Sequence, residues 1–226
     1  SMDKHLTKTL LAEAGISVGR WELVTEKQWS KDPQDVRSRI DALGYPVFVK
    51  PTRAGSSVGI SRVDSPDQLD LAIKEAAAND PRIIVEAMAH GREIECGVRV
   101  PAGGEAMAAP LGEIGVPEGE FYDYEHKYVD DVVGLSCPAD VPPAYAQRIR
   151  ETAWRAFDAL ECEGLARVDF FLDEATDTVI INEVNTMPGF TPISMYPQMW
   201  AAAGLSYPDL LSELLSEASQ RPLGLR

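Results

Sequence analysis

The spacing of hydrophobic residues divides the chain into helical and extended segments. Apolar residues that recur every three or four positions predict helices over 3–14, 33–43, 65–78, 146–160 and 207–218. Short apolar or alternating runs predict strands over 46–50, 59–63, 82–86, 93–100, 165–172 and 179–185. Helices combined with strands that follow one another closely favour an α+β fold with mainly antiparallel sheets.

Two stretches between these elements carry further local signals. Residues 65–68 have the sequence Ser-Pro-Asp-Gln, which is typical of a helix start with serine as the cap and proline in the first turn. Residues 101–140 lose the hydrophobic pattern and are rich in Pro, Gly and acidic residues around the aromatic cluster FYDYEHKY at 121–128. Loops of this length are often lids or binding loops, so we expect one here.

The composition is that of a folded acidic protein and argues against several classes of partner. With 226 residues, 45% of them hydrophobic, the chain is long enough to bury a core in one or two domains. Its formal net charge is −15. So acidic a surface argues against nucleic-acid and anionic membrane partners, which need a cationic field. It does not argue against one small anionic ligand in a locally basic pocket.

Cysteine usage and hydropathy indicate a cytoplasmic protein. The three cysteines are odd in number and widely spaced, which is typical of reduced thiols: Cys96, Cys137 and Cys162. No apolar run approaches the roughly 18 residues of a membrane span, and no secretory signal is visible. Ser1-Met2 resembles the remnant of a cleaved tag, so we expect position 2 to be an artificial start within a longer protein.

The most informative chemical signal is the predicted hairpin over 165–185. Residues two apart in a strand share a face, so Arg167 projects with Asp169. Glu183 and Asn185 share a face of the partner strand in the same way. If the two faces coincide, the oxygen ligands suit Mg²⁺ that bridges phosphates, and the arginine would neutralise an oxyanion beside the metal. The alternative is a solvated polar face, although polar residues in such apolar strands need buried partners.

Three other motifs carry weaker signals. Lys50 ends a strand before the Gly/Ser loop RAGSSVG, whose N–H groups could cradle phosphate, although the order is not that of a Walker A loop. Glu86 and Glu93 flank a turn and could bind ribose hydroxyls or act in acid/base catalysis. Lys127-Tyr128 could place a cation and a hydroxyl over a site. Each motif also fits a plain connection, an exposed turn or a surface aromatic cluster.

Histidine and methionine positions give no further site. The three histidines lack the spacing of zinc ligands, and the acidic turn DEATDT lacks the glycine and final glutamate of an EF-hand. Three methionines fit core packing better than a functional stripe: Met187, Met195 and Met199.

The order of the motifs is more specific than any one of them. K-P-x-x-x-G-S-S-x-G is followed by E-x6-E, F-Y-D-Y-E-x-K-Y, R-x-D and E-x-N-T-x-P-G. This succession resembles the ATP-grasp superfamily and, more narrowly, the D-alanine–D-alanine ligase family, from Asp3-Lys4 to the helix near 207–218. The resemblance implies two α+β subdomains, 1–85 and 86–226, whose mainly antiparallel sheets grip the nucleotide between them.

The resemblance also implies a role for each candidate residue. The ATP-binding positions would be Lys4, Phe48, Lys50, Ser56, Ser57, Ile60, Glu86, Met88, Glu93, Phe121 and Lys127. Two Mg²⁺ ions, with Mn²⁺ as an alternative, would be held by Asp169, Glu183 and Asn185. Catalysis would involve Ser56, Lys127, Tyr128, Arg167 and the Gly189 N–H, with the last two stabilising the tetrahedral intermediate. The substrate would contact Arg167, Gly189, Ser194 and Met195.

The activity implied is the ATP-dependent joining of two D-alanines through an acyl phosphate, for the peptidoglycan precursors that maintain the cell wall and cell shape. Tyr128 matches the lid tyrosine of the family and favours D-alanine as the second substrate. Ala87 is a departure, because the family often has lysine there. The alternatives are an ATP-grasp ligase for another amino acid or peptide, and a nucleotide-binding module without catalysis.

The family has an additional N-terminal domain that orients the first D-alanine, and this chain begins where the central domain would begin. We therefore expect an excised ATP-grasp portion that folds, binds Mg-ATP weakly and makes little or no dipeptide alone. The parent enzyme is expected to be a homodimer through the missing N-terminal region.

Overall fold

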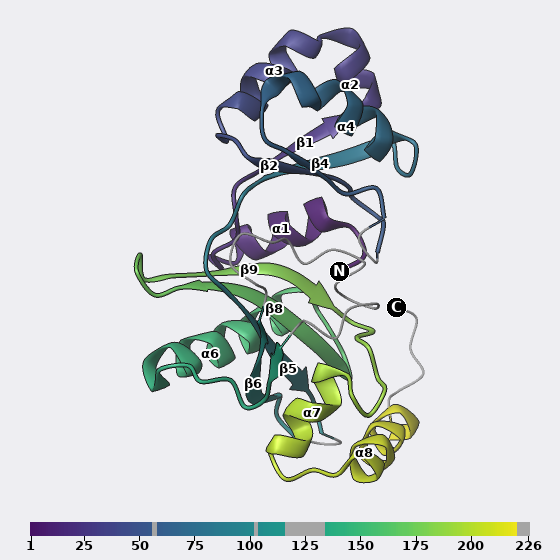
Figure 1. Ribbon diagram of the computed structural model, residues 1–226. Coiled ribbons are helices and arrows are strands. Elements are labelled where there is room, and N and C mark those ends of the chain that lie inside the picture. The colour runs from purple at the N-terminus through teal and green to yellow at the C-terminus, as the bar shows by residue number, and fades with distance from the viewer. Residues whose placement is uncertain (56–57, 102–103, 116–133, 221–226) are drawn as a thin grey trace.

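Two antiparallel sheets form the framework of the molecule, and helices cover them (Figure 1). The computed structural model describes residues 1–55, 58–101, 104–115 and 134–220. In Figure 1 the four-stranded sheet lies in the upper part of the view and the five-stranded sheet in the lower part. The predicted α+β class with mainly antiparallel sheets is confirmed.

The first sheet has the strand order β1-β4-β2-β3, and every neighbouring pair is antiparallel. Its strands are β1 (Trp21–Thr25), β2 (Val47–Pro51), β3 (Ser61–Val63) and β4 (Arg82–Ala87). Its helices are α2 (Glu26–Lys31), α3 (Pro33–Asp41), the 3₁₀ helix η1 (Pro66–Gln68) and α4 (Leu69–Ala77). Strands and helices together bury an apolar core that includes Val24, Ile40, Val47, Ile73 and Val85. Burial of such side chains is the main driving force for this packing.

The second sheet has the strand order β7-β6-β5-β8-β9, again antiparallel throughout. Its strands are β5 (Arg92–Arg99), β6 (Met107–Gly115), β7 (Gly134–Ser136), β8 (Leu165–Asp173) and β9 (Thr178–Asn185). Its helices are α6 (Pro143–Ala159), α7 (Met195–Ala202) and α8 (Tyr207–Gln220). One core under α6 includes Ile94, Ile149, Phe157, Val168 and Phe170. A smaller core joins α7 and α8 to β6 and includes Ala109, Tyr196, Trp200 and Leu210.

Helix α1 (Lys4–Glu13) lies between the two sheets (Figure 1). Leu11 and the following Ile16 belong to the core of the five-stranded sheet. The start of the helix contacts the first sheet, because the Lys4 N–H donates to the Thr52 carbonyl at 2.9 Å. A helix that precedes the first sheet in sequence therefore contributes to the core of the second.

The chain passes from the first sheet to the second close to the expected boundary after residue 85. The chain leaves β4 at Ala87 and enters β5 at Arg92. The division into subdomains 1–85 and 86–226 remains a prediction, and the packing of α1 is the point at which the structure differs from it.

The hydrophobic pattern located the long elements but missed several short ones. It did not predict β1, α2 or α7, and β6 crosses the region 101–140 that was expected to be a loop. Ser65 takes the predicted cap position with Pro66 in the first turn, but that turn is the 3₁₀ helix η1 without a side-chain cap bond, and the α-helix begins only at Leu69. The reason is local: the Ser65 hydroxyl donates to Asp67, and the Gln68 side chain accepts from the Asp64 N–H at 2.8 Å.

Methionine and cysteine positions follow the predictions with one exception. Met195 and Met199 are buried, whereas Met187 is 93% exposed, so the expectation of core packing is wrong for Met187. This residue lies in the irregular segment after β9, where no helix or strand face directs it inward. The three cysteines are free. Within the described ranges, every helix is too short or too polar to cross a bilayer.

Candidate active site

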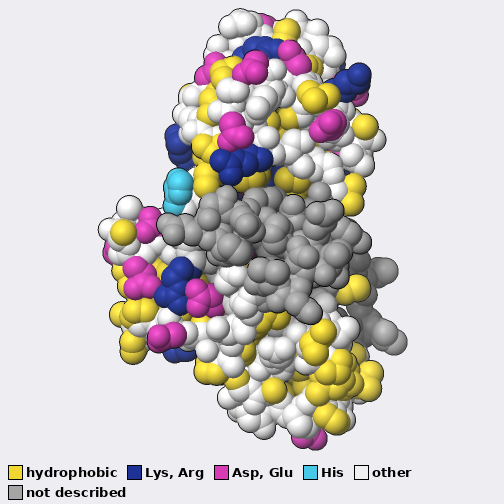
Figure 2. Space-filling view, viewed as in Figure 1, with side chains coloured by type: hydrophobic (Ala, Val, Ile, Leu, Met, Phe, Trp, Pro, Cys, Tyr) yellow, Lys and Arg dark blue, Asp and Glu magenta, His cyan; other side chains and the backbone are white. Residues whose placement is uncertain are grey.

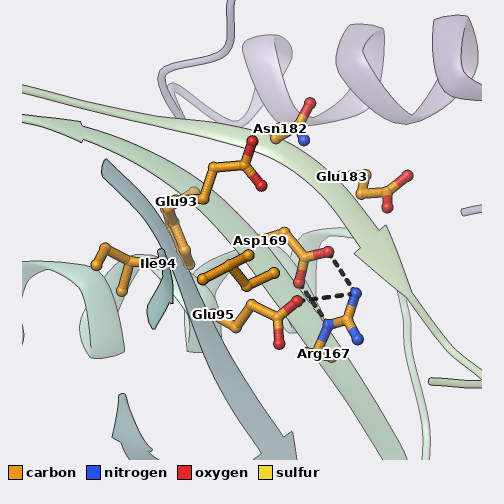
Figure 3. A pocket seen from close by; sticks show the side chains of 9 residues that line it. Glu93, Ile94, Glu95, Arg167, Asp169, Asn182 and Glu183 are labelled. Carbon is orange, nitrogen blue, oxygen red and sulfur yellow. Dashed lines mark hydrogen bonds and ion pairs between the residues drawn. The ribbon is translucent and has the colours of Figure 1, made fainter. Parts of the chain in front are cut away.

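The polar side chains of the β8–β9 hairpin gather in one hollow of the five-stranded sheet (Figure 3). The Arg167 guanidinium donates two hydrogen bonds to the Asp169 carboxylate, at 2.7 Å from Nε and 2.8 Å from Nη2. Asn185 Nδ2 donates to Asp169 Oδ2 at 2.9 Å. The same Nδ2 lies 3.3 Å from Glu183 Oε1. The predicted convergence of these four side chains is confirmed.

Strand register explains why they converge. Arg167 is paired with Asn185 and Asp169 with Glu183, and residues directly opposite each other share a face of the sheet. The register shifts next to Asp169, so that Asn182 has no opposite residue in this pairing. Such bulges often re-aim side chains beside active sites. Alternation along each strand predicted the shared face but gave no sign of the bulge.

Glu95 of β5 lies in the same hollow and was not predicted (Figure 3). It is 3% exposed; its Oε1 lies 3.1 Å from Arg167 Nη2, and its Oε2 has no hydrogen-bond partner among the described residues. Burial raises the pKa of Glu95 to about 8, and the negative charge of Asp169 acts in the same direction. Ile94 and Cys96 point into the core, so the alternation of β5 was the signal that could have identified Glu95.

A second ion cluster belongs to the first sheet and α1. Glu86 Oε1 lies 2.7 Å from Lys8 Nζ, and Glu86 Oε2 lies 2.7 Å from Lys50 Nζ. Burial favours a raised pKa for Glu86, but the charges of Lys50 and Lys8 outweigh it and lower the pKa to about 2. Burial likewise acts to lower the pKa of Lys50, but the charge of Glu86 prevails and raises it. Lys8 was missed, although its position one helical turn after Lys4 was a usable signal.

The base of the Gly/Ser loop is held by Asp80. Thr52 Oγ1 donates to the Asp80 carboxylate at 2.9 Å, and Arg53 Nη2 donates to it at 2.7 Å. The hydrogen bond from Arg53 is the main reason why the pKa of Asp80 lies well below its usual range. Lys4 Nζ donates to the Ala54 carbonyl at 2.5 Å. The predicted phosphate lysine Lys4 therefore lies beside this loop.

The segment after β9 brings two further predicted residues together. A Cβ on Gly189 would lie 3.1 Å from Ser194 Oγ, so the two are neighbours. Ser194 stands at the cap position of α7, but its hydroxyl accepts from the Thr191 N–H at 3.1 Å and does not cap the helix. Met195 is 5% exposed and packs against Gly112. Its side chain fills the core, so a substrate contact from Met195 would have to come from the backbone.

The remaining candidates lie around β2, β4 and β5. Phe48 is buried and is the cross-strand partner of Glu86, which places both on one face. Met88 is half-buried beside the end of β4, and Glu93 lines the hollow of Figure 3. Ile60 is half-buried just before β3. The predicted positions that lie outside the described residues are Ser56, Ser57, Phe121, Lys127 and Tyr128.

The chemistry of the hollow fits a divalent cation. In the part of the chain that the structure describes, no group of three or more His, Cys, Asp or Glu side chains is arranged to hold a metal ion. The predicted set differs, since it combines the carboxylates of Asp169 and Glu183 with the amide of Asn185, whose oxygen would face the ion after a flip. Oxygen ligands of this kind suit Mg²⁺. The hollow also holds Glu93 and Glu95, and this excess of carboxylates favours a cation.

Curated relatives cover the whole of this chain. It is 55% identical over 229 residues to a D-alanine–D-alanine ligase from Pseudarthrobacter chlorophenolicus, with 100% of this chain and 60% of that protein covered. It is 50% identical over 230 residues to a D-alanine–D-alanine ligase from Mycobacterium avium, with 100% and 61% covered. The chain therefore spans about 60% of the length of these relatives.

Solved structures show the same fold. A D-Ala:D-Ser ligase, VanG, from Enterococcus faecalis matches with a TM-score of 0.83 and 36% identity, over 96% of this chain and 61% of that one. The D-alanine–D-alanine ligase from Coxiella burnetii matches with a TM-score of 0.80 and 35% identity, over 96% and 56%. The predicted ATP-grasp fold is confirmed. The family model described as D-ala D-ala ligase C-terminus matches residues 10–216, so the chain belongs to this ligase family.

Proposed function

We propose that the chain forms the ATP-binding and catalytic part of a D-alanine–D-alanine ligase. The observation that carries this proposal is the convergence of one guanidinium, two carboxylates and one amide on the β8–β9 hairpin. These groups occur in a chain whose family is that of D-alanine–D-alanine ligases. The complete reaction would take place in the cytoplasm and supply the dipeptide of peptidoglycan precursors. The complete protein would act as a homodimer, through a region outside this chain.

The proposed reaction has two steps. A carboxylate is a poor electrophile, so the first D-alanine attacks the γ-phosphorus of ATP through its carboxylate oxygen, and ADP leaves. The amine of the second D-alanine then attacks the carbonyl carbon of this acyl phosphate. Inorganic phosphate leaves, the amine loses a proton, and a peptide bond has formed. Holding both reactants in line accounts for much of such a rate enhancement.

The nucleotide would be bound mainly from α1 and the first sheet, with Glu93 contributed by β5 of the second sheet. Lys4 and Lys50 would neutralise phosphate oxygens, and Asp80 would hold the base of the loop that carries Ser56 and Ser57. Glu86 and Glu93 would face the adenine amino group and the ribose hydroxyls. The apolar surface around the base would come from Phe48, Ile60, Met88 and Phe121.

The second sheet would supply the chemistry at the reacting atoms. Asp169, Glu183 and Asn185 would hold Mg²⁺, or Mn²⁺, which when bound neutralises phosphate charge. The Arg167 guanidinium and the Gly189 N–H would stabilise the tetrahedral oxyanion. The remaining roles at the substrates and the lid would fall to Ser194, Met195, Lys127 and Tyr128.

Two measurements test this proposal. Calorimetry with ADP and Mg²⁺ should show binding to the isolated chain, and that binding should weaken when EDTA is added. For the chemical steps, a chimera in which this chain replaces the matching 60% of the Pseudarthrobacter ligase should release phosphate when D-alanine and ATP are supplied. A folded chimera that binds ADP but releases no phosphate with any amino acid would refute the ligase function.

The second amino acid is a separate question, because the solved D-Ala:D-Ser ligase matches this chain with a TM-score of 0.83. The same phosphate-release assay with D-serine and D-lactate as second substrates distinguishes the alternatives. We expect the highest kcat/KM with D-alanine, as the tyrosine at position 128 suggests.

A further inference from the structure

The cluster of Lys8, Lys50 and Glu86 contains one more lysine than its carboxylate needs. Each oxygen of Glu86 lies 2.7 Å from a different lysine nitrogen, Lys8 at Oε1 and Lys50 at Oε2. The side chains are buried, with exposures of 6% for Lys8, 14% for Lys50 and 8% for Glu86. With all three groups ionised the cluster carries one net positive charge. No predicted function uses Lys8.

The three residues come from three elements that meet between the sheets. Lys50 and Glu86 each lie one residue before the end of their strands, β2 and β4, whereas Lys8 comes from α1, which packs on the core of the five-stranded sheet. The negative charges of Glu183 and Glu93, which belong to that second sheet, also act to raise the pKa of Lys50. The surplus positive charge therefore faces the carboxylates that would hold a nucleotide-bound cation.

The two lysines have different freedom to leave the carboxylate. Lys50 lies next to the last residue of β2, shortly before the Gly/Ser loop, and its side chain is the more exposed of the two, whereas Lys8 lies on a helix and is almost fully buried. A buried carboxylate that loses its only partner is strongly destabilised. If Glu86 had Lys50 alone, transfer of Lys50 to a phosphate would leave that carboxylate without a counter-ion.

We propose that Lys8 is a positioning residue that keeps Glu86 neutralised, so that Lys50 is able to bind a nucleotide phosphate. This inference rests on the proposed function, because it needs a phosphate ligand at Lys50. Lys8 itself does not contact the nucleotide. It acts by weakening the hold of Glu86 on Lys50, and its loss should reduce the contribution of the phosphates to binding while the contribution of the adenosine moiety is unchanged.

The test compares ADP, adenosine and inorganic tripolyphosphate as ligands of the full 226-residue chain, by calorimetry. In Lys8→Met the ratio of ADP affinity to adenosine affinity should fall by about tenfold or more, since Glu86 then holds Lys50 alone. Lys8→Arg should retain the wild-type ratio. The double variant Lys8→Met/Glu86→Gln should recover it, because the charge that retains Lys50 is gone. Tripolyphosphate affinity should follow the same order.

A matched control is Lys74→Met, which removes an exposed lysine of α4 and should leave the ratio unchanged. If Lys8 only fixes α1 to the first sheet, Lys8→Met will lower thermal stability and weaken all ligands in proportion, and the double variant will not recover the ratio. That result would overturn the inference.

The inference and the proposed function fail in different ways. ADP binding that is indifferent to Lys8 overturns the inference and leaves the ligase intact. A Lys8-dependent tripolyphosphate site in a chimera that releases no phosphate supports the inference and refutes the ligase. Where Lys8→Met does not fold, Glu86→Gln alone is compared with the double variant. The inference is supported if Glu86→Gln and the double variant have the same ratio of ADP affinity to adenosine affinity. A lower ratio in the double variant overturns it.

Discussion

Two glutamates of similar burial, one on each sheet, have pKa values that move in opposite directions. Counted over the whole residue and not the side chain alone, Glu86 is 6% exposed and Glu95 is 3% exposed. Burial acts to raise the pKa of both, yet that of Glu86 falls to about 2 and that of Glu95 rises to about 8. The difference lies in their partners, because Glu86 has two lysines, whereas Glu95 shares Arg167 with Asp169. The Glu86 cluster therefore has more cations than carboxylates, and the Glu95 cluster has more carboxylates than cations.

This contrast fits the two halves of a metal–nucleotide complex. Surplus positive charge beside the Gly/Ser loop complements phosphate oxygens, and surplus negative charge on the second sheet complements a divalent cation. Neither cluster alone distinguishes a nucleotide site from a structural ion network. The two clusters together, one with surplus positive charge and one with surplus negative charge, favour a ligand that carries both phosphate groups and a divalent cation.

The largest expected effect comes from removing Arg167, whose guanidinium contacts the carboxylates of Asp169 and Glu95. Arg167→Ala in the ligase chimera should lower kcat roughly 10²–10³-fold, by comparison with the loss of an oxyanion donor. ADP affinity should change much less, because the proposed role of Arg167 is in the chemical step and not in nucleotide binding. Steady-state phosphate release and calorimetry measure the two quantities. Unchanged turnover in a folded variant would contradict the proposed role of Arg167.

The next largest effect is expected at Glu86, the carboxylate held by Lys8 and Lys50. Because the folded pKa of Glu86 is depressed from 4.5 to about 2, its stabilising contribution is complete above about pH 4.5 and is lost as the pH falls toward 2. The shift corresponds to about 3 kcal/mol in the free energy of unfolding. Glu86→Gln should therefore be destabilised relative to wild type at pH 6, and the difference should shrink at low pH.

Urea unfolding of the two proteins at several pH values between 2.5 and 7 measures this difference. A gap that stays constant across the range would show that Glu86 acts through packing rather than charge.

The sequence predicted one of these clusters much better than the other. Strand alternation located Arg167, Asp169, Glu183 and Asn185, because their contacts depend only on the register of one hairpin. Alternation along β5 separates Glu95 only from the core residues on either side of it, and its contact with Arg167 requires β5 to lie beside β8, two strands that are far apart in sequence. A pairing between such strands is decided by the whole sheet and leaves no local signal.

The Glu86 cluster depends on even more distant packing. Lys8 meets Glu86 only because α1 folds between the sheets and buries Leu11 in the second core. On its own, the sequence of α1 shows a lysine on an amphipathic helix, for which a solvated position is the usual expectation. Family resemblance supplied the proposed roles of the other site residues but gave none to Lys8 or Glu95, whose contacts are visible only in the structure.

A smaller effect is expected at Glu95. Because its folded pKa is raised from 4.5 to about 8, its favourable contribution is complete below about pH 4.5 and is lost as the pH rises toward 8. Glu95→Gln should therefore gain stability relative to wild type between these values. The gain should be about 1–2 kcal/mol, since glutamine also alters the contact between the Glu95 side chain and Arg167.

Chemical unfolding with EDTA present measures the gain, and added Mg²⁺ should reduce it if the hollow binds the ion. If Glu95→Gln instead loses stability, and loses more as the pH rises, the predicted opposite behaviour of Glu86 and Glu95 is contradicted.

The smallest effect is expected at an exposed ion pair, which serves as a reference for both buried clusters. Arg148 Nη1 lies 2.9 Å from Asp177 Oδ1, and their side chains are 40% and 73% exposed. Water screens such a pair, so Arg148→Ala should change the free energy of unfolding by only about 0.2–1 kcal/mol. The effect should decrease further in 1 M NaCl, where the Debye length is only about 3 Å. The effect of Glu86→Gln should persist in the same salt, because solvent ions have little access to a carboxylate enclosed by two lysines. If salt abolished both effects equally, the distinction between a buried ion cluster and a surface ion pair would fail.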